Sequence, residues 1–301
     1  MGFRNIMLQS PGRLWVRRQQ LVFDNGCETA LPLEDINGVV IENQQIVITA
    51  AALASLAEAG VCVYFCDQKH LPSAVLTPYG KYSRPLKVLG AQLKATKPQY
   101  KRLWQQIVRQ KVENQATVLA LTGRQQGRNH LMALAEQVRS GDSTHIEAAA
   151  AAFYFRQIFG EGFSRGMPCL INAALNYGYA ILRGQIARTL ALYGFEPALG
   201  ICHHNELNPF NLADDLIEVY RPEVDLYVAD LEKMTTAEAL TPKVKQGLFR
   251  LLNMDVLSDG QHCAVYFAID RTVQSLANVL NGEENTLKLC SILPLEIHDY
   301  E

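Results

Sequence analysis

The spacing of apolar residues along the sequence changes once, near residue 80, and this change limits how the chain can fold. Before it, short runs of β-branched and aromatic residues such as RLWVRRQQLVFDN and DINGVVIENQQIVIT are broken by Asn, Gly, Asp and Pro, the residues that bound strands and tight turns. After it, apolar residues recur every three to four positions, the period of an amphipathic helix. The sequence therefore predicts an α+β chain with a small β-rich domain over residues 1–80 and a larger, all-helical domain over residues 81–301.

One helix is expected to interrupt the β-rich part. TAAALASLAEAG, residues 49–60, has Thr49 as an N-cap and Gly60 as a stop, and the apolar strand VCVYFCD follows it. The turn-rich LPSAVLTPYG, residues 71–80, closes this part. With 49% hydrophobic residues among 301, the chain can bury a sizeable core, so we expect a globular protein.

The net charge of −2 conceals a strongly basic segment. Residues 81–128 hold eleven Lys and Arg residues against the single acid Glu113, with Tyr82, Tyr100 and Trp104 among them. A solvated helix face is the usual explanation of a charge run, but a local balance of +10 with interleaved aromatic residues favours contact with the DNA backbone. We expect that contact to involve Lys81, Arg84, Lys97, Lys101 and Arg102.

Cysteine spacing and hydropathy indicate the compartment. The seven cysteines are scattered, with no C-x-x-C pair, which suits free thiols in a reducing cytosol. The N-terminal residues lack the apolar core of a signal peptide, and no window reaches the roughly 18 apolar residues of a membrane span. We therefore expect a soluble, cytoplasmic protein with no membrane partner.

Two histidines precede a predicted helix that carries carboxylates, in GICHHNELNPFNLADDLIEVYRP, residues 200–222. Asn211 is the expected N-cap, and Asp215 and Glu218, three apart, share one face of the helix. Because like charges repel, a metal ion or an arginine nearby would relieve the pair, and an imidazole from the loop would complete a site suited to Mg²⁺ or Mn²⁺. The alternative is a set of solvent-exposed polar residues with Arg221 as their counter-charge.

Glu147 is a second candidate. It opens EAAAAAFYF, an apolar helix on which a lone carboxylate would be poorly solvated. The alternative is a capping box, in which Thr144 and Glu147 satisfy free amides at the start of the helix.

Four blocks in a fixed order resemble a known family. EAAAAAFYF, NAALNYGYA, GFEPALGICH and DLIEVYRPEVD are similar in order and spacing to the motifs of the CRISPR-associated integrase that captures new spacers, the endonuclease of the adaptation step. VVIENQQIVITAAALASLAEAGVCVYFCD resembles the β-rich domain of that family, so the resemblance covers most of the chain. NELNPFNLADDLIE further resembles the type II subtype, which operates with a single-protein effector nuclease.

The resemblance implies a set of site residues. Its catalytic metal ligands fall on Glu147, His203 and Glu218, with Mg²⁺ or Mn²⁺ as the cofactor, although His204 could substitute for His203. Direct metal binding by Asp215 is left open. The neighbouring positions are Asp215, Arg221, Tyr154 and Tyr177. We expect Arg221 to orient Glu218, and the two tyrosines to pack in the core.

The resemblance also implies a reaction and partners. The 3′-hydroxyl of a captured DNA fragment attacks a phosphodiester at the edge of a CRISPR repeat, and water in its place gives nuclease activity. The expected partners are double-stranded DNA, a second copy bound through the β-rich domain, a small ferredoxin-like CRISPR-associated protein that bridges two such dimers, and the effector nuclease. Two alternatives remain: a nuclease of the same fold acting on branched or single-stranded DNA, and a non-catalytic DNA-binding subunit.

Overall fold

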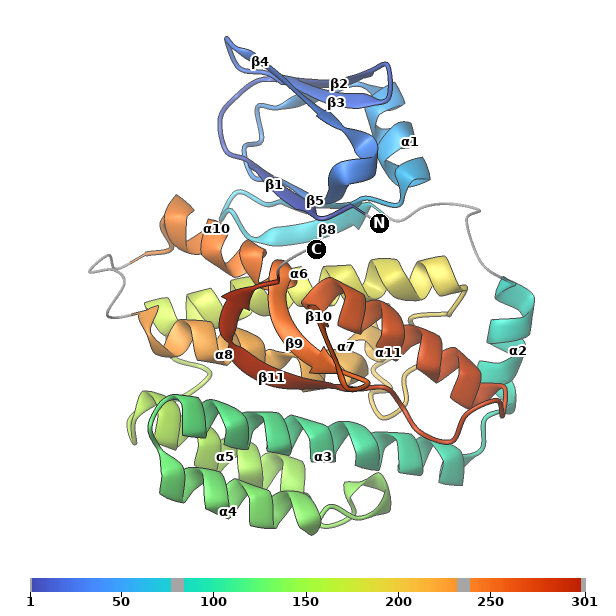
Figure 1. Cartoon of the computed structure of the whole chain (residues 1–301), viewed down its shortest axis with the longest axis vertical. Coiled ribbons are helices and arrows are strands. Elements are labelled where there is room, and N and C mark those ends of the chain that lie inside the picture. Colours follow the sequence, from blue (N-terminus) through green and yellow to red (C-terminus); the bar gives the residue numbers. More distant parts are fainter. Residues whose placement is uncertain (1, 77–83, 232–238, 299–301) are drawn as a thin grey trace. The chain divides into compact units, whose positions relative to one another are not determined.

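The chain divides into two units, Met1–Ser83 and Arg84–Glu301, coloured from blue to red along the sequence in Figure 1. The computed structural model describes residues 2–76, 84–231 and 239–298. The first unit is rich in strands and the second in helices, which confirms the predicted α+β class.

Two four-stranded sheets form the first unit. One has the order β1-β5-β7-β8, with β1, β5 and β7 parallel and β8 antiparallel, and the other has the order β4-β3-β2-β6. Their strands are β1 (Arg4–Leu8), β2 (Arg13–Arg17), β3 (Gln20–Asp24), β4 (Glu28–Pro32), β5 (Ile36–Ile41), β6 (Val47–Ile48), β7 (Cys62–Cys66) and β8 (Pro72–Leu76). Strand β5 is buried along its whole length between two parallel neighbours, as is typical of the central strand of a parallel sheet.

The predicted helix of this unit is α1 (Ala50–Ala59), and both expected end signals are present. The Thr49 hydroxyl accepts a hydrogen bond from the Ala52 amide at 3.2 Å. Gly60 ends the helix with φ 73°, a left-handed conformation that costs glycine little. Leu56 of α1 is fully buried in a core that Leu14 and Val39 of the two sheets share.

The second unit contains α2 (Pro85–Lys94), α3 (Lys97–Leu121), α4 (Gln125–Glu136), α5 (Ile146–Phe159), α6 (Leu170–Tyr193), α7 (Asn211–Leu216), α8 (Arg221–Ala229), α10 (Pro242–Arg250) and α11 (Val265–Leu280). Helix α3 packs on α4, α5 and α8 and therefore lies at the centre of the segments that carry the candidate motifs. The Asn114 side chain on α3 donates to the Val219 carbonyl at 2.8 Å and to the Cys290 carbonyl at 3.1 Å, which fixes α3 against segments more than 100 residues away.

A three-stranded antiparallel sheet makes this unit differ from the all-helical domain that the sequence predicted. Its order is β10-β9-β11, with β9 (Met254–Ser258), β10 (Gln261–Ala264) and β11 (Cys290–Ile297). The β9–β10 connection is the dipeptide Asp259-Gly260, with φ 53° and 72°. Positive φ at both central residues is the type I′ hairpin turn that Asp-Gly favours, so the signal that the prediction missed lies in the sequence itself.

None of the helices described here combines the length and the apolar character needed to cross a membrane. No disulfide joins any of the seven cysteines, all of which lie in described parts of the chain.

Candidate active site

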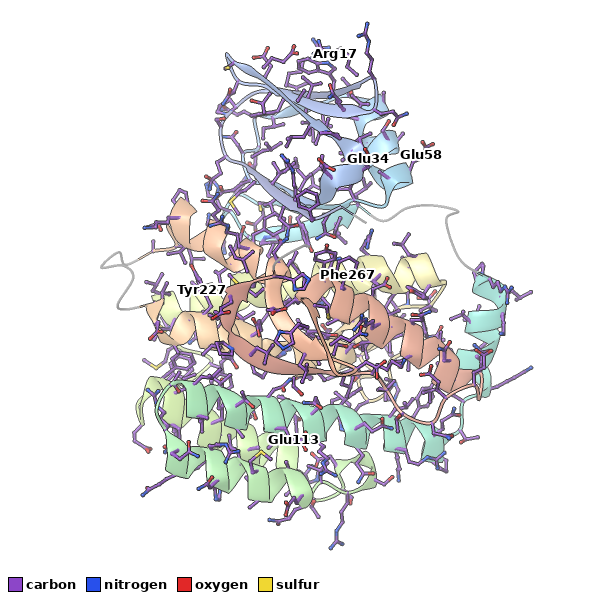
Figure 2. The ribbon with its side chains drawn as sticks, viewed as in Figure 1. Arg17, Glu34, Glu58, Glu113, Tyr227 and Phe267 are labelled. Carbon is purple, nitrogen blue, oxygen red and sulfur yellow. The ribbon has the colours of Figure 1, made fainter. Side chains whose placement is uncertain are left out.

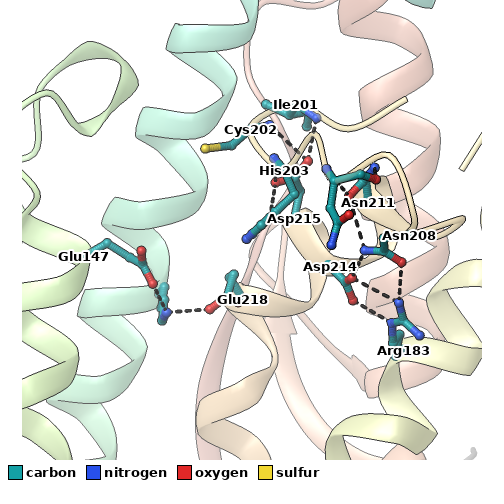
Figure 3. A network of polar contacts seen from close by, with 12 residues as sticks. Glu147, Arg183, Ile201, Cys202, His203, Asn208, Asn211, Asp214, Asp215 and Glu218 are labelled. Carbon is teal, nitrogen blue, oxygen red and sulfur yellow. Dashed lines mark hydrogen bonds and ion pairs between the residues drawn. The ribbon is translucent and has the colours of Figure 1, made fainter. Parts of the chain in front are cut away.

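A buried lysine lies between two of the predicted carboxylates. Lys111, on the middle of α3, places its Nζ 2.5 Å from Glu147 Oε1 and in contact with Glu218 Oε2, and these contacts are the dashed lines between the two glutamates in Figure 3. The Lys111 and Glu218 side chains are each only 8% exposed, while Glu147 is partly open to solvent. Two carboxylates from other helical segments, 36 and 107 positions beyond Lys111 along the chain, therefore converge on its positive charge.

The charges stabilise one another against the cost of burial. Burial acts to raise the pKa of Glu218, but the Lys111 ammonium and the Arg221 guanidinium outweigh it and hold that pKa below its usual value. Burial likewise acts to lower the pKa of Lys111, and the carboxylates of Glu218 and Glu147 reverse the effect and raise it. Glu218 and Lys111 are consequently both ionised near neutral pH, which a buried site tolerates because each charge has an opposite partner.

Glu147 is available for this contact because another residue caps its helix. The two oxygens of Asp142 accept hydrogen bonds from the Ile146 amide at 2.9 Å and the Glu147 amide at 3.0 Å. The residue before α5 is His145, which provides no side-chain cap. The capping box of Thr144 and Glu147 is therefore wrong, and the Glu147 side chain reaches Lys111 instead.

His203 lies in the loop before α7 and is held by Asp215. Its Nδ1 is 2.8 Å from Asp215 Oδ1, and the His203 side chain is 47% exposed. The hydrogen bond to Asp215 leads the causes that raise the pKa of His203. With Nδ1 engaged by a carboxylate, Nε2 is the nitrogen left for a ligand, the arrangement that commonly orients metal-binding histidines.

Asp215 itself is fully buried and organises the loop. Its carboxylate also accepts hydrogen bonds from the backbone amides of Ile201, Cys202 and His203, at 2.5, 3.1 and 3.1 Å. Gly200 is required beside it, because a Cβ there would lie 2.2 Å from the His203 carbonyl oxygen and 2.8 Å from Asp215 Oδ2. Asp215 is therefore committed to holding His203 and its loop.

Asn211 differs from its expected role as the N-cap of the following helix. It is the first residue of α7, and Phe210 is the cap position. The Asn211 side chain accepts the Asn205 amide at 3.2 Å and donates to the carbonyls of Ala198 and Asn205, both at 3.0 Å. It thus braces the same loop from the other side.

Glu218 lies on a tighter turn than the continuous helix that the sequence suggested. Helix α7 ends at Leu216, and Ile217–Val219 form a 3₁₀ turn before α8 begins. Arg221 Nε pairs with Glu218 Oε1 at 3.0 Å. The other oxygen, Oε2, is buried in contact with the Lys111 ammonium.

The donor chemistry of these residues fits a hard divalent cation. Carboxylates are the ligands that Mg²⁺ and Mn²⁺ prefer, and Glu147 and Glu218 already share one cation, the Lys111 ammonium, while His203 offers an imidazole with an anchored Nδ1. As they stand, no three His, Cys, Asp or Glu side chains in the described ranges are close enough together to hold a metal ion. Lys111 instead supplies the positive charge between Glu147 and Glu218.

The predicted DNA-binding residues are exposed where they are described. Arg84 directly precedes α2, and Lys97, Lys101 and Arg102 lie on the first turns of α3. Lys81 lies outside the described residues. A pocket of about 290 Å³ is lined by Lys97, Tyr100, Lys101, Trp104, Gly141, Ile201, Cys202 and His204.

This pocket adjoins the histidine loop. Trp104 packs edge-on against the His203 ring, with 5.9 Å between the ring centroids, while His204 faces the pocket. The exposed basic end of α3 and the predicted ligand His203 are therefore neighbours. Glu113, labelled in Figure 2, pairs with Arg109 at 2.9 Å and so offsets only part of the basic charge.

The remaining predicted positions are buried. Tyr154 and Tyr177 are both fully buried, which supports core packing. Sequence reasoning missed Lys111, which it counted only as one of eleven basic residues. The available signal was its position in the buried stripe of α3 that includes Trp104 and Val108, where a lysine needs a buried partner.

Comparison with known proteins shows the family of the chain. Residues 6–243 match the family model described as CRISPR associated protein Cas1. The chain belongs to the Cas1 family. It is 46% identical to the CRISPR-associated endonuclease Cas1 of Neisseria meningitidis, over all of both chains.

Two solved structures share the fold. A casposase bound to integration product matches with a TM-score of 0.78 at 20% identity, over 95% of this chain and 92% of the other. A Cas6-RT-Cas1–Cas2 complex matches with a TM-score of 0.72 at 20% identity, over 96% of this chain and 36% of the other. The Cas1 fold is thus present over nearly the whole chain.

Proposed function

We propose that this Cas1-family protein is a metal-dependent DNA integrase and endonuclease of CRISPR adaptation. The observation that carries the proposal is the convergence of Glu147 and Glu218 on one cationic position, with His203 held by Asp215 on the neighbouring loop. A basic, aromatic-lined surface adjoins that loop. Carboxylates gathered around a cation beside a phosphate-binding surface suit phosphodiester chemistry.

Glu147, Glu218 and the Nε2 of His203 would hold Mg²⁺ or Mn²⁺. When bound, the ion would supply positive charge for the attacked phosphate and would favour deprotonation of an oxygen nucleophile. Asp215 keeps His203 in one orientation, and Arg221 offsets the charge of Glu218. Arg84, Lys97, Lys101 and Arg102 would bind the DNA backbone.

The reaction is an exchange of phosphodiesters. The 3′-hydroxyl oxygen of the captured fragment attacks the phosphorus at the edge of the repeat, a new P–O bond forms, and the original P–O bond breaks to release a 3′-hydroxyl on the repeat strand. The attacking hydroxyl loses a proton and the departing oxygen gains one. One phosphodiester replaces another, so no nucleotide triphosphate is consumed.

The partners follow from the same proposal. A solved complex with this fold contains Cas1 and Cas2, which supports a small CRISPR-associated partner, and the casposase bound to integration product supports DNA as the substrate. We infer a homodimer formed through the β-rich unit, bridged to a second dimer by a ferredoxin-like partner. The NELNPFNLADDLIE segment favours a type II system and thus contact with its effector nuclease.

A strand-transfer assay tests the reaction. The protein is incubated with a repeat-bearing plasmid, its bridging partner and a DNA duplex whose 3′ ends are either free or blocked. Half-site products only with free 3′-hydroxyls support integration. Cleavage of branched or single-stranded DNA that ignores the 3′ end would favour the nuclease alternative, and inactivity with intact DNA binding would favour a non-catalytic subunit.

A further inference from the structure

Lys111 has surroundings that set it apart from the other described lysines of the basic segment. Those at 87, 94, 97 and 101 are exposed, whereas Lys111 is 6% exposed and lies on the buried stripe of α3. Its ammonium contacts Glu147 on one side and Glu218 on the other. A buried cation with two carboxylates from distant segments is a structural connection between α3, α5 and the turn at Glu218.

The Lys111 ammonium occupies the space between the two carboxylates, where a metal ion bound by both would also have to lie. Lys111 Nζ is 2.5 Å from Glu147 Oε1 and also contacts Glu218 Oε2, so the ammonium lies directly between the two carboxylates. A cation bound by both Glu147 and Glu218 would need the same oxygens that Lys111 now contacts. Two cations cannot occupy one such space, because their charges repel at short range.

We propose that Lys111 is a positioning residue whose ammonium takes the place of the divalent cation in the metal-free protein and moves away when the metal binds. This inference rests on the proposed metal-dependent function. Without metal, the ammonium keeps two carboxylates from repelling each other and holds the ligands near their binding positions. With metal, the same ammonium is a competitor that lowers the affinity of the site.

Direct Mn²⁺ binding tests the competition. Isothermal titration with MnCl₂ compares the wild type with Lys111→Met, which keeps the length of the side chain without its charge. We expect Lys111→Met to bind Mn²⁺ about tenfold more tightly or better, because removal of a neighbouring positive charge favours a cation. Lys243→Met, an exposed lysine on α10, is the matched control and should leave the affinity unchanged. Equal or weaker binding by Lys111→Met would overturn the inference.

Thermal unfolding tests the positioning role with a readout independent of activity. In EDTA, Lys111→Met should melt roughly 5 to 10 °C below the wild type, because the buried Glu218 and the partly exposed Glu147 lose their shared partner. Saturating Mn²⁺ should restore most of this loss. An equal loss with and without Mn²⁺ would contradict the inference, because it would make Lys111 a packing residue only.

A second variant covers the case in which Lys111→Met does not fold without metal. Lys111→Met combined with Glu147→Gln removes one of the two repelling charges and should melt above Lys111→Met alone in EDTA. A double variant that is no more stable would also contradict the inference. A wild type that binds no Mn²⁺ would contradict the proposed function itself, whereas wild-type binding with unchanged affinity in Lys111→Met contradicts only the role of Lys111.

Discussion

At the scale of single residues, the two adjacent histidines illustrate how position decides chemistry. His203 has its Nδ1 bonded to a buried carboxylate and its ring against Trp104. His204, the next residue, instead lines the pocket at the basic end of α3. The two imidazoles share composition and sequence neighbourhood, but only His203 is oriented by an acceptor.

We expect His203→Ala, Glu147→Ala and Glu218→Ala each to lower strand transfer by about 100-fold or more, because each removes a proposed ligand. His204→Ala should retain most of the activity. The measurement is the yield of half-site product, with circular dichroism as the check on folding. An inactive His204→Ala beside an active His203→Ala would reverse the assignment.

A second residue-scale prediction concerns Glu223, which is fully buried with neither carboxyl oxygen hydrogen-bonded within the described residues. Burial raises the pKa of Glu223 to about 8. The folded state therefore keeps a proton that the unfolded state releases above about pH 4.5, and stability falls as pH rises from there to about 8. The slope is about 1.4 kcal/mol per pH unit at most.

Glu223→Gln should flatten this decline, since the amide does not ionise. Denaturant melts at pH 5, 6, 7 and 8 measure it. Burial also raises the pKa of Asp225 to about 6, so ionisation of Asp225 lowers the stability of the protein in the same direction. Part of the slope between pH 4 and 6 should therefore persist in Glu223→Gln. An unchanged slope up to pH 8 in Glu223→Gln would show that Glu223 is ionised in the folded protein.

At the scale of elements, α3 carries exposed basic residues at its start and a buried lysine at its middle. Its first turns present Lys97, Lys101 and Arg102 to solvent, and its middle buries Lys111 against the carboxylates. Thr96 caps its start by accepting the Gln99 amide at 3.4 Å. One rigid helix thereby sets the distance between a proposed DNA-binding surface and the proposed site.

The combined variant Lys97→Ala, Lys101→Ala and Arg102→Ala should weaken DNA binding and flatten the plot of log affinity against log salt by about 2 to 3 in slope, because each phosphate contact releases about one counterion. Fluorescence anisotropy at several salt concentrations measures it. The Mn²⁺ affinity should be unchanged, since these side chains lie on the exposed first turns of α3, whereas Glu147 and Glu218 contact Lys111 in the middle of the helix. An unchanged slope would leave this face as a solvated surface.

Elements also show what the sequence could and could not indicate. Local chemistry predicted α1 to the residue, because Thr49 and Gly60 act within one turn of the helix. The pairing of β11 with β9 depends on contacts more than 30 residues apart, which no local pattern encodes. The burial of Lys111 could be inferred from the apolar stripe of α3, but its partners Glu147 and Glu218 could not, since they come from other segments.

At the scale of the whole molecule, the number of candidate sites predicts assembly. Joining two ends of one fragment to two strands requires two active sites at a fixed separation, and the described chain brings the predicted ligands Glu147 and Glu218 to a single position. A symmetric dimer supplies the second site. Strand edges of the β-rich unit, such as the exposed β4, are surfaces that a partner strand or copy can cover.

We expect a dimer in isolation and a larger complex with the bridging partner. Light scattering coupled to size exclusion at micromolar concentration measures both. A monomer at that concentration would contradict the dimer. Full two-ended integration by this chain without a second protein would contradict the bridge.

The contact between Gly200 and the loop that it adjoins has a practical consequence. A methyl group at position 200 would meet the carbonyl of His203 at 2.2 Å, so Gly200→Ala must displace the histidine without removing any charged group. Such a variant should assemble without strand-transfer activity, because its proposed DNA-contacting lysines and both glutamates are intact while His203 is displaced. Mixed with the wild type, it would report how many working copies an assembled integration complex needs, because product yield would fall in proportion to its share or more steeply.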